Sequence, residues 1–129
     1  MLLSTTLCLT AAAVIVNIWL GIRIGQLRHK KGISVGHGED ELLMRRMRAQ
    51  LNFIEQTPLT LLLVGGVELA GHGGAWLAPA GAAFILGRIA HAYGMDDRFK
   101  AGRGIGMATS MLFQLALVVV AVLAALHRL

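Results

Sequence analysis

Polar side chains interrupt the long apolar segment that begins near residue 46. Arg48, Asn52 and Glu55 have the spacing i, i+4 and i+7, which places them on one face of a helix. A guanidinium binds a carboxylate through paired donors, and an amide beside a carboxylate suits amide or ammonium groups. This stripe therefore predicts a binding site for a small anionic ligand that also carries an amine.

A second polar stripe lies in the next apolar segment, where Arg88 and His91 have the spacing i and i+3. At about 1.5 Å per residue, Glu55 and Arg88 both lie about 12 to 14 Å from the charged sequence at the same end of their helices. This matched depth predicts an ion pair between Glu55 and Arg88, which would hold the bundle together, contact a ligand, or do both. Arg23 lies at the same end of the first segment. Together these groups describe a cationic pocket, and glutathione, with two carboxylates, an ammonium, two peptide bonds and a thiol, fits it.

Membrane helices must position these stripes. The chain has 129 residues, of which 56% are hydrophobic, and its mean hydropathy is +0.67, well above that of soluble domains. A spanning helix needs about 20 mostly apolar residues, and four such segments occur, at about 2–27, 46–70, 75–95 and 105–126. Small residues in all four let helices approach closely. We therefore expect an all-α fold with a single membrane domain over residues 1–129, in which four helices form a left-handed bundle.

Positive charge is concentrated in two loops, and the net charge of the chain is +5. Short loops rich in Lys and Arg stay in the cytoplasm. We expect loops 28–46 and 96–104 there, both termini on the opposite side, and no binding of nucleic acid. Anchoring at the membrane surface would by itself account for Arg23, Arg48 and, at the far end, Glu68.

The sequence gives little support to metal, disulfide or transport functions. Its one cysteine, Cys8, cannot form a disulfide within the chain. The five histidines are scattered without ligand spacing, so no metal site is expected. The lack of an inverted repeat disfavours a transporter.

The motifs RMRAQLNFIEQTPLTLLL, with VELAG after it, and GRIAHAYGM resemble the membrane-associated proteins in eicosanoid and glutathione metabolism, the MAPEG family. The resemblance covers nearly the whole chain and is to bacterial members similar to microsomal glutathione transferase. It implies a homotrimer of four-helix subunits in the bacterial inner membrane. It also implies that glutathione binds as a co-substrate between neighbouring subunits on the cytoplasmic side.

The resemblance further implies roles for individual residues. A basic residue at the end of the first segment would contribute to the site, either Arg28 or Arg23. Arg103, near the start of the fourth segment, would stabilise the glutathione thiolate, because a thiol with a pKa of about 8.5 is mostly protonated at neutral pH. The residues expected to bind glutathione are Arg28, Arg48, Asn52, Glu55, Arg88 and His91.

Two residues depart from the well-studied eicosanoid enzymes of that family. Gln56 and His91 stand where those enzymes have tyrosines, which argues against leukotriene or prostaglandin synthesis. Two functions remain open. One is a transferase or peroxidase that acts on lipophilic electrophiles or lipid hydroperoxides entering from the bilayer. The other is a non-catalytic membrane protein of the same fold that binds glutathione, another small anion or a lipid.

Overall fold

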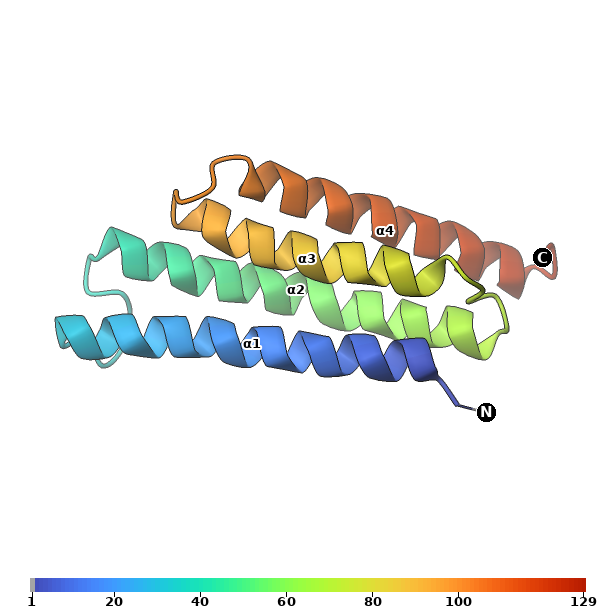
Figure 1. The fold of residues 1–129 in the computed structure, drawn as a ribbon, viewed down its shortest axis with the longest axis horizontal. Helices are drawn as coiled ribbons and strands as arrows, with labels where there is room; N and C mark the ends of the chain where they lie inside the picture. Colours follow the sequence, from blue (N-terminus) through green and yellow to red (C-terminus); the bar gives the residue numbers. More distant parts are fainter. Residues whose placement is uncertain (1) are drawn as a thin grey trace.

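Four antiparallel helices make up residues 2–129, the part of the chain that the computed structural model describes (Figure 1). In chain order they are α1 (Ser4–Lys31), α2 (Glu41–Leu69), α3 (Leu77–Met95) and α4 (Gly102–Ala125). No strand occurs within residues 2–129, which confirms the predicted all-α, four-helix fold. α1 and α2 both extend beyond their predicted membrane segments toward the loop that joins them, because polar residues continue a helix wherever its terminal backbone groups find partners.

Asp40 fixes the start of α2. Its carboxylate accepts a hydrogen bond from the backbone N–H of Leu43 at 2.8 Å, as an N-cap residue does. Lys31, the last residue of α1, donates to the same carboxylate. The bond from Lys31, and then that from Leu43, lower the pKa of Asp40 below its ordinary value. An ionised Asp40 therefore joins the end of α1 to the beginning of α2.

The central helices of the bundle are α2 and α3. Each packs against all the other helices, whereas α1 and α4 do not contact each other. Loops 32–40 and 96–101 lie at one end of the bundle, and the connection between α2 and α3 lies at the other end with both termini (Figure 1). The two basic loops thus share one end, as their charge predicts.

The outer surface of α4 indicates whether the bundle is surrounded by water or by lipid. By length and composition, α1 and α4 are apolar enough to cross a membrane. Along its whole length α4 exposes large apolar side chains, namely Met107, Met111, Leu112, Leu115, Val118, Val119 and Val122. Such a continuous apolar face is unfavourable in water and is accommodated by lipid. The protein is an integral membrane protein.

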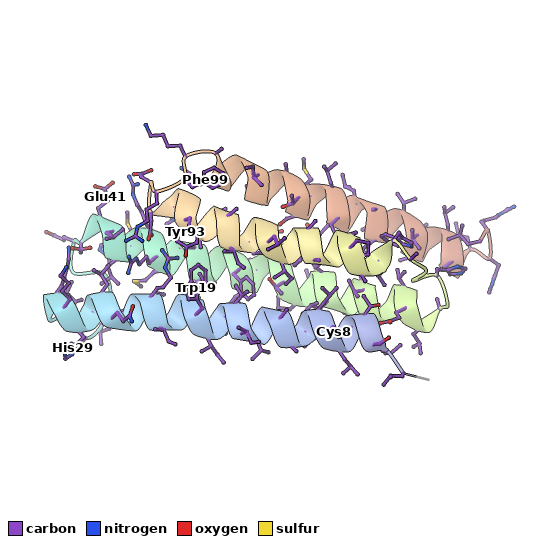
Figure 2. The ribbon with its side chains drawn as sticks, viewed as in Figure 1. Cys8, Trp19, His29, Glu41, Tyr93 and Phe99 are labelled. Atoms are coloured by element: carbon purple, nitrogen blue, oxygen red, sulfur yellow. The ribbon has the colours of Figure 1, made fainter. Side chains whose placement is uncertain are left out.

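A buried ion cluster joins α1, α2 and α3 near the end that carries the basic loops. The Asp96 carboxylate, whose side chain is 1% exposed, pairs with Arg23 and, at 3.3 Å, with Arg46. The Arg23 guanidinium lies 4.8 Å from the centre of the Trp19 ring, and that ring lies 5.5 Å from the Tyr93 ring (Figure 2). Arg23 is therefore held between aromatic rings and a carboxylate. The expectation that it joins the cationic pocket is wrong, because Asp96 neutralises it inside the bundle.

At the opposite end of the bundle, Glu68 of α2 caps α1. Its carboxylate accepts hydrogen bonds from the backbone N–H groups of Thr5 and Thr6, at 2.9 and 2.8 Å, and from the Thr6 hydroxyl at 2.6 Å. The first N–H groups of a helix have no partner within it and attract negative charge. Glu68 thus does more than anchor α2 at the membrane surface, since it fixes α1 against α2.

Candidate functional site

A polar cavity of about 280 Å³ lies between α2, α3 and α4, toward the end that carries the basic loops. α2 contributes Arg48, Asn52 and Glu55, which confirms that the spacing i, i+4 and i+7 puts them on one face. The remaining lining residues are Leu51, His91, Met95, Arg103 and Met107. One cavity therefore collects five of the seven residues that the sequence singles out.

The charged side chains around this cavity are free to bind a ligand. Arg48, Glu55 and Arg103 are all exposed. Within residues 2–129 none of the three takes part in an ion pair. His91, in contrast, is only 6% exposed and forms part of the inner wall. Two guanidiniums and one carboxylate without partners match a ligand that carries charges of both signs.

Arg88 lies behind the cavity and does not line it. Its side chain is 2% exposed and donates hydrogen bonds of 2.5 Å to the Asn52 side-chain oxygen on α2 and to the Gly106 carbonyl on α4. The predicted ion pair between Arg88 and Glu55 is wrong. Depth along the helices is similar for the two residues, but Glu55 faces outward while Arg88 points inward. Arg88 thus holds Asn52 in place rather than reaching a ligand in this cavity.

Close packing of α3 against α4 brings His91 and Arg103 to one cavity and lets Arg88 reach the Gly106 carbonyl. Gly106 of α4 makes this approach possible, since a Cβ there would lie 2.5 Å from the His91 Cβ and 2.6 Å from the Gly87 carbonyl oxygen. No side chain larger than hydrogen fits at that distance. The sequence shows many glycines in the membrane segments, but not which of them lies at this contact.

Arg28 lies in a second cavity, of about 540 Å³, between α1 and α2. There it donates a hydrogen bond of 2.5 Å to the Gly36 carbonyl in the loop between these helices. Arg48 lines both cavities, so the two lie on either side of α2. Within one chain, Arg28 therefore shares a cavity with Arg48 but with none of the other predicted ligands.

Sequence reasoning missed the apolar part of the lining and the partner of Gln56. Leu51, Met95 and Met107 give the polar cavity an apolar wall. Gln56 accepts a hydrogen bond from Gln114 of α4 at 2.9 Å through its side-chain oxygen. Gln114 is a polar residue at a similar depth in α4, and this match could have predicted the contact with Gln56. Gln56 therefore serves packing between α2 and α4.

Comparison with protein families matches residues 6–123 of this 129-residue chain to the MAPEG family. The chain belongs to the MAPEG family. Comparisons with curated proteins and with solved structures gave no match. MAPEG membership agrees with the bundle of membrane helices and links the chain in general terms to glutathione-related metabolism at membranes.

Proposed function

We propose that this MAPEG protein is a membrane-bound glutathione-dependent transferase or peroxidase that acts on lipophilic electrophiles or lipid hydroperoxides. One observation carries the proposal: Arg48, Glu55 and Arg103 meet without ion-pair partners, among residues 2–129, around a single cavity with an apolar wall. Free charges of both signs suit glutathione, and the apolar wall suits a second substrate that arrives from lipid.

Each polar residue of the cavity has a chemical task in this proposal. Arg48 binds a glutathione carboxylate through paired donors. Asn52 and Glu55 hold its amide and ammonium groups, while His91 closes the inner wall. Arg103 faces the sulfur, where its positive charge favours the thiolate, the nucleophilic form of the thiol.

The same proposal includes a homotrimer. The cavity of about 280 Å³ is slightly smaller than most ligand sites, which span roughly 300 to 1,000 Å³. Arg28 stands in the separate cavity between α1 and α2, which it shares with Arg48 but with no other predicted ligand of its own subunit. In the trimer, Arg28 of one subunit completes the site of its neighbour. Glutathione then binds between subunits.

The membrane orientation follows from the positions of the charges. Both basic loops lie at the end of the bundle where the cavity opens. Basic loops stay in the cytoplasm, so the proposal places glutathione on the cytoplasmic side of a bacterial inner membrane. Both termini then lie on the other side.

Titration of the detergent-purified protein with glutathione, followed in the ultraviolet absorption band of the thiolate, tests this function. We expect a thiolate signal in the unchanged protein. Arg103→Ala should raise the pKa of the bound thiol by about one unit or more and remove the signal at neutral pH. Arg98→Ala, in the exposed loop next to it, serves as the matched control and should leave the signal unchanged.

Other outcomes of this titration contradict the proposal. Heat of binding without a thiolate signal would identify a non-catalytic protein that binds glutathione. Absence of binding would exclude glutathione as the ligand. A cross-linking experiment that detects only monomers in the membrane would exclude the trimer.

A further inference from the structure

A third cavity, of about 260 Å³, lies between α1 and α2. Along the bundle axis it is farther from the basic loops than the two cavities described above. Most of its lining is apolar and comes from Ala13, Val14, Phe53, Ile54, Pro58 and Leu61. Asn17 and Thr57 also line it, one from each helix. Thr10 of α1 lines it as well. These polar side chains bring hydrogen-bonding groups into a mostly apolar space, so their partners decide what the cavity can hold.

Neither the Asn17 nor the Thr57 side-chain oxygen has a hydrogen-bond partner within residues 2–129. The side-chain oxygens of Asn17 and Thr57 are both buried and make no hydrogen bond. Thr57 is only 3% exposed, so bulk water does not supply the missing hydrogen bond. A buried polar group without a hydrogen bond costs about 1 to 3 kcal/mol. Two such groups on the same cavity point to a ligand that supplies the missing bonds.

Pro58 removes one helical hydrogen bond from this wall. Proline has no N–H, so the carbonyl of the residue four positions earlier, Ile54, lacks its helical partner. Ile54 lines the same cavity. The site therefore offers acceptors at Asn17 and Ile54 and a hydroxyl at Thr57 that can both accept and donate. The complementary group is an O–H, which donates one hydrogen bond and accepts another.

We infer that this cavity binds the O–H group of a lipophilic ligand, the hydroxyl or hydroperoxide of an acyl chain. The O–H donates to the Asn17 oxygen and accepts from the Thr57 hydroxyl, and the apolar wall receives the neighbouring methylene groups. An unoxidised acyl chain has no donor and leaves both groups unpaired. The cavity thus selects oxidised lipids over their parent lipids.

The cavity lies on the α1 side of α2, beside the cavity that contains Arg28, which the proposed trimer joins to the glutathione site of a neighbouring subunit. Thr57 is two residues beyond Glu55, a rise of about 3 Å along α2. Ile54 lines both this cavity and the larger one that contains Arg28 and Arg48. The assignment of a lipid hydroperoxide as second substrate rests on the proposed glutathione-dependent function. Binding of the O–H group itself needs no glutathione.

Equilibrium binding of two neutral probes to the full chain in lipid nanodiscs, without glutathione, tests the inference. The probes are radiolabelled methyl hydroxystearate, with its hydroxyl in mid-chain, and methyl stearate. The unchanged protein should bind the hydroxylated ester about tenfold more tightly. Thr57→Val and Asn17→Leu should each remove most of that preference. Their melting temperatures should not fall, because each removes a buried group that has no partner.

Ser110→Ala is the matched control, because Ser110 carries another buried hydroxyl without a partner and does not line this cavity. It should keep the full preference. Equal binding of the two esters by the unchanged protein would overturn the inference, as would a preference that survives in both variants. Linoleic acid hydroperoxide should displace the bound hydroxylated ester, and failure to do so would overturn the hydroperoxide assignment.

The two proposals can fail separately. Loss of the glutathione signal with a retained preference for the hydroxylated ester would refute the proposed function and support this site. A glutathione thiolate signal without that preference would refute this site and support the proposed function.

Discussion

Arg88 on α3 donates a hydrogen bond to the side-chain oxygen of Asn52 on α2, and it makes no ion pair with Glu55. This bond links the buried centre of the bundle to the wall of the polar cavity. Glu55 consequently keeps its charge free at the surface of the cavity. The two residues therefore have separate tasks, which single substitutions can distinguish.

Arg88→Met should destabilise the protein by about 2 to 5 kcal/mol, because it leaves the Asn52 side-chain oxygen without its donor and removes one of the donors to the Gly106 carbonyl inside the bundle. Glutathione affinity should fall as well, since Asn52 is no longer held. Thermal unfolding in detergent and calorimetric titration measure the two effects. An unchanged melting temperature would show that the bonds of Arg88 do not support the fold.

Glu55→Gln should weaken glutathione binding about tenfold or more, with a stability change within about 0.5 kcal/mol, as expected for an exposed residue. The loss reflects the missing carboxylate opposite the ligand ammonium. Glu39→Gln, an exposed acid in the loop before α2, is the control and should bind glutathione normally. A large fall in the melting temperature of Glu55→Gln would instead indicate a structural ion pair.

Gly106→Ala should destabilise the bundle by about 1 to 3 kcal/mol, because the added methyl overlaps His91 and the Gly87 carbonyl. Gly104→Ala lies on the same helix with open space around it and should stabilise α4 by up to about 1 kcal/mol. The comparison of their melting temperatures isolates the helix contact. Equal behaviour of the two variants would contradict the close approach of α3 and α4.

Asp96→Asn should destabilise the protein by about 3 to 5 kcal/mol, because it leaves Arg23 and Arg46 buried without a negative partner. Asp97→Asn removes only the exposed pair with Arg45 and should cost at most about 1 kcal/mol. Chemical denaturation of both variants checks the difference. If Asp97→Asn destabilised the protein more than Asp96→Asn, the buried ion cluster would not be what holds the helices together.

Asp40 gives the protein an acid-sensitive element. Its pKa is lowered in the folded state, so its contribution to stability is present above the unfolded value, about 3.9, and is lost as the pH falls below it. Asp40→Asn keeps a good N-cap but cannot be ionised. Its melting temperature should depend less on pH between roughly 5 and 3. Identical acid profiles for the two proteins would contradict this role.

The sequence alone determined the number of helices, the face that carries Arg48, Asn52 and Glu55, and the common end of the basic loops. These features depend on local periodicity, hydrophobic length and charge, each of which a single segment contains. The match to the MAPEG family over residues 6–123 agrees with that reading.

Only the tertiary structure decided which partner each long side chain takes. Depth along a helix placed Glu55 beside Arg88, but the rotation of α3, and its approach to α4 at Gly106, turned Arg88 toward Asn52 instead. Arg23 forms an ion pair with Asp96 for the same reason. A sequence pattern fixes positions on one helix, whereas contacts depend on the rotation and spacing of two, which the packing of small residues sets.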